Sequence, residues 1–148
     1  MQGIDINKLG KILITGGTGF VGSYLTRRLV GSGAQVRIFD NNFRGKIQRL
    51  RNYLDKIEYV EGDITDIDHV YESCKGIDTI FHLAFINGTE NFYRVPGKVL
   101  EVGVKGALHT LDAAMNCGVK NYIVTSSSEV YQEPVHIPTP ESERIIIP

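Results

Sequence analysis

Three glycines spaced three residues apart, Gly16, Gly19 and Gly22, follow the apolar run that begins at Lys11. Their value is that a backbone without side chains can approach a ligand closely. Gly16 permits a sharp bend after a buried strand, Gly19 lets a pyrophosphate reach the backbone, and Gly22 lets the following helix pack closely. The free N–H groups and the dipole of that helix attract phosphates. The spacing therefore predicts a dinucleotide-binding turn.

An acidic side chain ends the next predicted strand. Asp40 lies 18 residues past Gly22, close to the ~20-residue spacing at which a carboxylate meets the adenosine ribose hydroxyls of NAD. A carboxylate would repel a 2′-phosphate, which favours NAD, while the nearby Arg37 and Arg44 keep NADP open as an alternative. A glycine-rich turn that binds no ligand is the other interpretation. No Lys-Ser or Lys-Thr follows the glycines, which excludes a Walker-type phosphate loop.

Composition narrows the class of protein. The 148 residues are 42% hydrophobic with a formal net charge of −1, which fits one α/β domain with a substantial core and argues against a nucleic-acid partner. No apolar run approaches the ~20 residues that span a bilayer, and the N-terminus lacks a signal-peptide pattern, so no membrane partner is expected. Cys74 and Cys117 are isolated, and neither they nor the four histidines have metal-ligand spacing. We expect reduced thiols, no metal and a cytoplasmic location.

Strands and helices alternate along the chain. The pattern predicts strands at 12–14, 35–40, 57–60, 79–83 and 122–125, and helices at 24–30, 47–54, 67–74 and 96–117. Asp66 would cap the helix at 67–74. The apolar face of the long helix is predicted to comprise Val99, Leu100, Val104, Ala107, Leu108, Leu111, Ala114 and Met115. Such alternation produces a doubly wound parallel sheet, with ligands beyond the carboxyl ends of its strands.

Five segments in order carry a family resemblance. TGGTGFVG, Asp40-Asn41-Asn42, Gly62 to Asp66, His82-Leu83-Ala84 and Tyr122 to Tyr131 together resemble the extended short-chain dehydrogenase/reductase family, the NAD-dependent nucleotide-sugar epimerases and dehydratases. The resemblance implies an N-terminal extension over 1–10, a Rossmann-type NAD-binding domain over 11–131 that stops after its fifth strand, and an irregular Pro-rich segment over 132–148 that leads to a C-terminal substrate region.

The resemblance also assigns cofactor contacts. Phe20 and Val21 would offer backbone N–H groups to the pyrophosphate of NAD. Asp40, Asn41 and Asn42 would hold the adenosine ribose. The remaining contacts would flank the adenine, through Asp63 and Ile64, or line the path toward the nicotinamide, through Leu83, Ala84 and Phe85.

Chemistry is assigned to the segment after the fifth strand. By resemblance, Ser127 would hydrogen-bond the reacting sugar oxygen, beside a tyrosine whose phenolate a lysine ammonium stabilises. NAD would take a hydride from the sugar and return it. Glu129 occupies the position of an acid/base in the dehydratase branch, which keeps 4,6-dehydration open beside 4-epimerisation. An ordinary polar turn containing Ser127 and a solvated Glu129 is the structural alternative.

Three departures from the family pattern matter. No Tyr-x-x-x-Lys follows Ser127 before Pro148, so we expect this chain to be the N-terminal part of a longer enzyme and to be inactive alone. The string from Tyr71 to Lys75 precedes the serine, and we interpret it as coincidental. Gly103 replaces the usual asparagine of the long helix, and Phe85 replaces a small residue near the nicotinamide.

The resulting hypothesis is that the protein is an NAD-dependent epimerase or dehydratase that acts on a UDP-, dTDP- or GDP-hexose. When full length, it is expected to be a homodimer. The alternative is a non-catalytic NAD-binding regulatory module. A Tyr-x-x-x-Lys downstream would favour the enzyme, and its absence the module.

Overall fold

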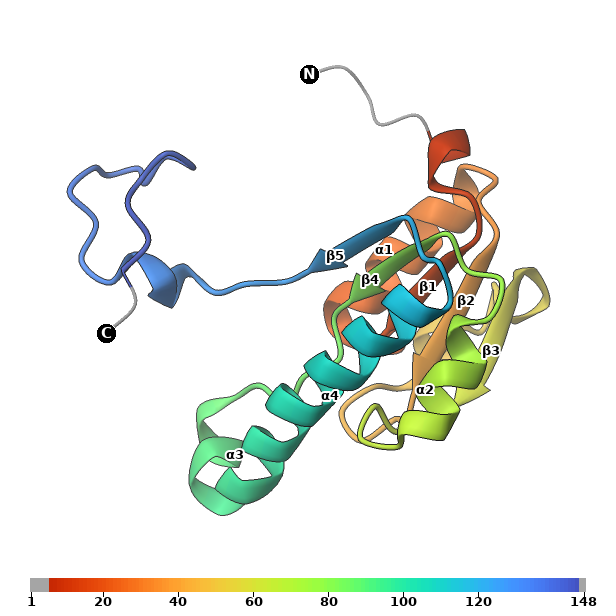
Figure 1. The fold of residues 1–148 in the computed structure, drawn as a ribbon, viewed down its shortest axis with the longest axis horizontal. Helices are drawn as coiled ribbons and strands as arrows, with labels where there is room; N and C mark the ends of the chain where they lie inside the picture. Colours follow the sequence, from red (N-terminus) through yellow and green to blue (C-terminus); the bar gives the residue numbers. More distant parts are fainter. Residues whose placement is uncertain (1–5, 147–148) are drawn as a thin grey trace.

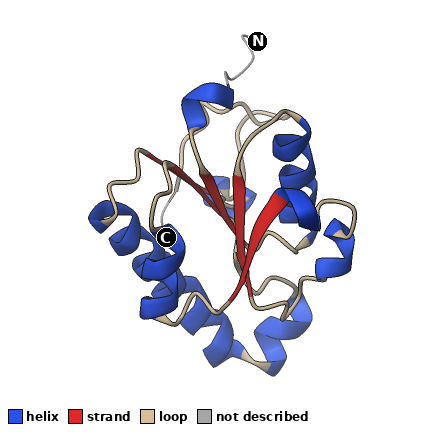
Figure 2. Cartoon of the chain, turned by 90° about the vertical axis from the view of Figure 1, so that its right-hand side faces the viewer, coloured by secondary structure: helices blue, strands red, loops and turns tan. Residues whose placement is uncertain are grey.

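Five short strands assemble into one parallel sheet in the order β3-β2-β1-β4-β5. The computed structural model describes residues 6–146. The strands are β1 (Ile12–Thr15), β2 (Val36–Asp40), β3 (Ile57–Glu61), β4 (Thr79–His82) and β5 (Asn121–Val124). Helices cover both faces of the sheet (Figure 2), so the predicted doubly wound Rossmann-type fold is confirmed. The strand order reverses between β1 and β4, where such folds open a crevice.

The helical elements are α1 (Phe20–Gly31), α2 (Ile67–Cys74), α3 (Thr89–Arg94) and α4 (Pro96–Asn116). Four 3-10 turns complete the described chain: η1 (Ile6–Leu9), η2 (Ile47–Leu50), η3 (Leu54–Lys56) and η4 (Ser128–Tyr131). Among residues 6–146, none of the helices has the length and apolar character needed to cross a lipid bilayer.

Alternation along β1 sorts the core into two layers. Leu13 faces a cluster built with α2 and α4, whereas Ile12 and Ile14 face a cluster that contains Leu29 of α1. All three β1 side chains are almost fully buried, as expected for a central parallel strand covered on both faces. β1 therefore holds the glycine turn that follows it on a rigid support.

The predicted apolar face of α4 is largely wrong. The buried positions of the helix are Val99, Val102, Gly106, Thr110, Ala113 and Ala114. Small residues are on this face because the helix lies so close to its neighbours that a Cβ at Gly106 would overlap Ile64 Cδ1. The larger predicted residues point outward, with exposed side chains at Leu100, Val104, Leu108, Leu111 and Met115. Close packing, and not hydrophobicity alone, selected the buried face.

Two other local predictions have different outcomes. Residues 47–54 do not form one helix but parts of η2 and η3, with Leu50 as the buried anchor. The cap of α2 is confirmed, since the Asp66 side chain accepts hydrogen bonds from the backbone N–H groups of Asp68 and His69. The short helix α3 was not predicted.

The chain after β5 runs away from the sheet (Figure 1). Beyond η4, the described residues to 146 contain only turns, bends and irregular backbone, as the proline-rich sequence predicted. β5 itself pairs with β4 on one side, and its Ile123 and Val124 side chains are exposed. The sheet is therefore well covered at β1 and open at β5.

Candidate functional site

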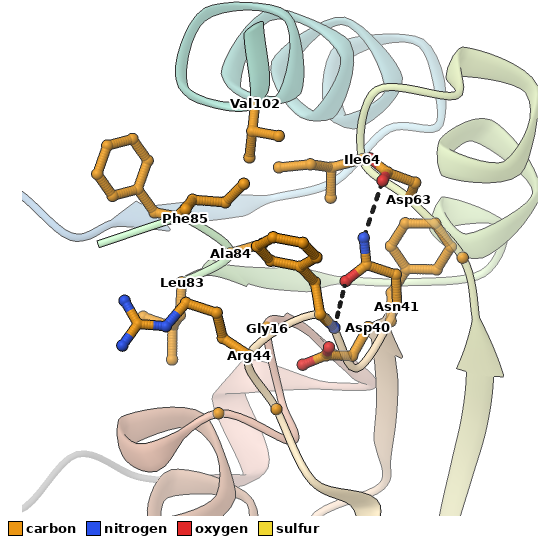
Figure 3. Close-up of a pocket in the computed structure, with 16 residues that line it drawn as sticks. Gly16, Asp40, Asn41, Arg44, Asp63, Ile64, Leu83, Ala84, Phe85 and Val102 are labelled. Atoms are coloured by element: carbon orange, nitrogen blue, oxygen red, sulfur yellow. Dashed lines mark hydrogen bonds between the residues drawn. The ribbon is translucent and has the colours of Figure 1, made fainter. Parts of the chain in front are cut away.

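A cleft lies beyond the carboxyl ends of the strands, over the switch point between β1 and β4 (Figure 3). It encloses about 560 Å³ of open space, part of which is continuous with solvent. The lining residues predicted from sequence are Gly16, Gly19, Asp40, Asn41, Asp63, Ile64, Leu83, Ala84 and Phe85. The fold thus gathers residues from four separate strand ends into one cleft.

Each glycine of the turn meets a different constraint. Gly16 has φ +73°, and a Cβ there would lie 2.8 Å from the backbone nitrogen of Ala84. A Cβ at Gly22 would overlap the carbonyl oxygen of Gly16, whereas one at Gly19 would lie 3.1 Å from that oxygen. Gly16 and Gly22 are therefore required by the fold, while Gly19 leaves backbone exposed to the cleft.

The N-terminus of α1 fits an anionic ligand. Gly19 is its N-cap, and among the described residues no side chain caps the helix. Ser23 is the first residue of the helix whose backbone N–H bonds back to the cap carbonyl, at 3.0 Å. The preceding N–H groups, including those of Phe20 and Val21, belong to the unpaired first turn and carry the positive end of the helix dipole. This end of α1 can bind a phosphate through backbone alone.

Asp40 fastens the glycine turn to β2. Its Oδ2 accepts a hydrogen bond of 2.9 Å from the backbone N–H of Thr18, and its Oδ1 accepts one of 2.8 Å from that of Asn42. The side chain is buried but borders the cleft. Each carboxylate oxygen keeps a second lone pair, so Asp40 can still accept hydrogen bonds from ligand hydroxyls.

The two arginines named for a 2′-phosphate differ in position. Arg37 points away from the cleft, where it pairs with Glu58 at 2.8 Å and donates to the carbonyl oxygen of Ser73 at 2.7 Å. That ion pair lowers the pKa of Glu58, mainly through the hydrogen bond from Arg37 and then the one from Lys11. Arg44 does line the cleft.

A polar pair joins the ends of β2 and β3. Asn41 donates from Nδ2 to Asp63 Oδ2 at 2.8 Å, and its Oδ1 accepts from the backbone N–H of Phe43 at 2.9 Å (Figure 3). Burial alone would raise the pKa of Asp63, but hydrogen bonds from Thr65 and Asn41 and the charge of Lys98 outweigh it, so this pKa is lowered. Asp63 is an ionised acceptor held in place at neutral pH.

Part of the lining was not predicted from the sequence, and Arg44 was named only for the NADP alternative. The lining residues without a prediction are Phe39, Phe43, Gly45, Gly62, Ile86 and Val102. Phe43 and Arg44 approach segments that follow β4 in the chain. The Nζ of Lys98 in α4 lies 4.6 Å from the centre of the Phe43 ring, and a Cβ on Gly88 would lie 3.1 Å from Arg44 Nη1. For Phe43 and Arg44 the only signal in the sequence was their place just after a predicted strand, where ligand-binding residues gather.

Several predicted site residues do not line this cleft. Gly22 is buried beneath the turn, and the side chains of Phe20 and Val21 are exposed beside Tyr24 in a second hollow. Asn42 turns its Nδ2 to the hydroxyl of Tyr59. Ser127 and Glu129 are exposed in the segment after β5, where Ser127 Oγ accepts a hydrogen bond from the backbone N–H of Glu129. Their catalytic roles stay predictions.

His82 supports the cleft from below. Its Nδ1 lies 2.8 Å from Thr15 Oγ1, and its ring stacks on Tyr122 with centroids 6.1 Å apart. Burial lowers the pKa of His82 to about 4, so it is neutral at pH 7. Its side chain is buried and does not line the cleft. Within residues 6–146, no group of three His, Cys, Asp or Glu residues is placed to hold a metal ion.

Comparison with known proteins identifies relatives. The model of the NAD dependent epimerase/dehydratase family matches residues 12–146. UDP-glucuronic acid decarboxylase 1 of Xenopus tropicalis is 35% identical over 136 residues, which is 90% of this chain and 30% of that protein. A 3 beta-hydroxysteroid dehydrogenase/Delta 5→4-isomerase of Mycobacterium tuberculosis is 36% identical over 127 residues, covering 83% of this chain and 33% of the relative.

A solved structure shares both fold and sequence. UDP-glucose 4-epimerase from Brucella ovis, in complex with NAD, superposes with a TM-score of 0.81 at 28% identity, covering 93% of this chain and 42% of the other. The chain thus spans about a third of the length of the curated relatives described above.

Proposed function

This chain belongs to the NAD-dependent epimerase/dehydratase family, and we propose that its cleft binds NAD as the cofactor-binding portion of a nucleotide-sugar epimerase or dehydratase. The observation that carries the proposal is the junction of the uncapped α1 N-terminus with the Asp40 carboxylate across the glycine turn. The helix end binds anionic oxygens and the carboxylate binds hydroxyls. A pyrophosphate linked to a ribose satisfies both at once.

NAD is favoured over NADP by the charges at the β2 end. A 2′-phosphate would lie against the Asp40 carboxylate, whose burial strengthens the repulsion. Arg37 is held by Glu58 and faces away. Arg44 is the remaining cation of the two, and its position on the cleft wall makes it the residue to test for residual NADP binding.

A nucleotide sugar is the proposed substrate class, with a UDP-, dTDP- or GDP-hexose as the candidates. Relatives named for a nucleotide sugar and for a steroid match this chain at 35% and 36% identity. The matched residues therefore reflect the shared cofactor region more than the substrate. We propose that residues outside this cleft select among these sugars.

Ser127 and Glu129 are the proposed contributors to chemistry. NAD supplies a hydride acceptor and donor when bound. Ser127 would hydrogen-bond the reacting sugar oxygen, and Glu129 would move a proton during a dehydration. Both side chains are exposed in the described structure and hence accessible to a substrate. Because no Tyr-x-x-x-Lys follows Ser127 in this sequence, we propose that the chain alone has little or no turnover.

We propose that the full-length protein is a homodimer that associates through α4. Its outward ridge, comprising Leu100, Val104, Leu108, Leu111 and Met115, is exposed and apolar, and such a stripe favours burial against a second helix. In a two-fold dimer the same ridge meets itself, so apolar side chains face apolar side chains on both subunits.

A cytoplasmic location is also proposed, since Cys74 and Cys117 are free.

The alternative is a non-catalytic module that binds NAD to regulate a partner. The exposed position of Ser127 and Glu129 is compatible with it. Adding a nucleotide sugar to the NAD-loaded full-length protein separates the two, because only the enzyme converts the sugar.

Calorimetric titration with NAD⁺ tests the proposal, with Asp40→Ala as the comparison. We expect binding by the wild-type chain and a loss of roughly tenfold or more in the variant, the scale of a hydrogen bond to a charged group. Glu61→Ala, at a strand end but absent from the cleft lining, is the matched control. No binding by the wild-type chain would refute the proposal.

A further inference from the structure

Phe85 and Gly103 come from separate elements and meet at one wall of the cleft. Phe85 follows β4, and Gly103 lies in α4. A Cβ placed on Gly103 would lie 2.9 Å from Phe85 Cε2, closer than normal van der Waals contact. The phenyl ring thus occupies the space that a side chain at position 103 would need. The two sequence departures at these positions are a single structural feature.

The ring itself faces the cleft. Phe85 lines it and is 47% exposed, and Figure 3 places its side chain across the cleft from Asp63 and Asn41. A phenyl ring has no hydrogen-bond donor for a phosphate, so it suits the flat or apolar face of a ligand ring. This wall is chemically unlike the carboxylate end.

Sheet topology determines which half of a dinucleotide reaches this wall. β2 and β3 lie on one side of β1, and β4 lies on the other. Asp40, Asn41 and Asp63 therefore stand on one side of the glycine turn, and Phe85 on the opposite side. A dinucleotide whose adenosine is held at Asp40 and whose pyrophosphate crosses the turn extends its other half toward Phe85.

We infer that Gly103 positions the Phe85 ring as an apolar wall that contacts the half of the dinucleotide beyond the adenosine. The inference rests on the proposed function. Phe85 is the residue that contacts the ligand, and Gly103 acts only through it. The absence of a side chain at position 103 keeps the ring in place.

A larger residue at 103 should change the cleft more than the stability. The ring of Phe85 is half exposed and can rotate away from an added methyl group. At Gly106, in contrast, an added Cβ would overlap the buried Ile64, which cannot move as easily. Gly103→Ala should therefore leave the fold intact and displace the ring that forms the wall.

Titrations with NAD⁺ and with AMP, combined with thermal unfolding, test this inference. Phe85→Ala should weaken NAD⁺ binding about tenfold and leave AMP binding unchanged, while Phe85→Leu should retain most of the affinity. Gly103→Ala should weaken NAD⁺ binding about fivefold, but less than about twofold when Phe85 is already alanine. Gly97→Ala is the control, because a Cβ at this α4 position meets nothing within 4 Å.

The outcomes separate the inference from the proposed function. Loss of the Gly103→Ala effect in the Phe85→Ala background supports the inference, because a merely structural role of Gly103 would be additive. Additive losses, or equal losses for NAD⁺ and AMP, overturn it while leaving NAD binding established. If the wild-type chain binds neither ligand, the proposed function fails and the inference fails with it.

Discussion

Alanine substitutions at Gly19 and Gly22 should separate ligand binding from folding within one turn. At Gly22, a methyl group would overlap the carbonyl oxygen of Gly16 and lie 2.8 Å from Gly17 Cα. Both neighbours are backbone atoms that cannot rotate away. At Gly19, the methyl group would lie 3.1 Å from the Gly16 oxygen, and φ is −64°, a value that alanine adopts easily.

The expected magnitudes differ accordingly. Unstrained carbon contacts lie at about 3.5–4.0 Å, so Gly22→Ala forces a backbone shift that costs about 3 kcal/mol by the scale of overpacked cores. Up to about 1 kcal/mol returns through the better helix propensity of alanine. A net loss near 2 kcal/mol lowers the melting temperature by about 4–8 °C in a domain of this size. Gly19→Ala should cost less than about 1 kcal/mol.

NAD⁺ affinity, unlike stability, should be reduced by the substitution at Gly19. A methyl group at Gly19 projects where a pyrophosphate must approach the helix end, so NAD⁺ affinity should fall at least about tenfold in a folded protein. Thermal unfolding followed by circular dichroism gives the stability, and calorimetry gives the affinity. Gly31→Ala in the last turn of α1, where a Cβ meets nothing within 4 Å, is the control. Wild-type affinity in Gly19→Ala, or control-like stability in Gly22→Ala, would refute this reasoning.

Two further predictions concern the support below the cleft and the outer face of α4. The pKa of His82 is about 4 when folded and near 6.5 when unfolded, so the unfolded state binds more protons between these values. The free energy of unfolding should therefore fall as the pH drops from 7, by about 2 kcal/mol at pH 5. Urea unfolding at several pH values should show that His82→Asn has lost this dependence. An unchanged pH dependence in the variant would contradict the prediction. In the full-length protein, Leu108→Lys on the α4 ridge should convert the dimer to a monomer in sedimentation, whereas Leu54→Lys, at an exposed leucine in η3, should not. A wild-type full-length protein that is monomeric at tens of micromolar would exclude the proposed dimer.

Much of the fold could be predicted because its signals are local. The run Ile12-Leu13-Ile14 of β1 is continuous and apolar, and Asp66 caps its helix through the backbone N–H groups of residues two and three positions away. The glycine turn and Asp40 are separated by one helix and one strand, so their spacing along the chain translates directly into proximity in space. Residues 47–54 were less predictable, since short 3-10 turns carry no sustained periodicity.

The cleft as a whole could be recognised only from the tertiary structure. Whether Arg37 or Arg44 faces the ligand depends on Glu58, a neighbour from another strand. The pairing of Phe85 with Gly103 joins two departures that look unrelated along the chain.

The parallel sheet, the glycine turn and the carboxylate at the end of β2 follow from the amino-acid sequence alone, because each depends on residue type and spacing within a short segment. The buried face of α4, in contrast, depends on how the helix packs against distant segments. That helix is apolar on more than one side, and the buried side is the one whose small residues allow closer packing. Shape complementarity between distant segments is not encoded in any single segment, and it determined both the core packing of α4 and the wall of the cleft at Phe85.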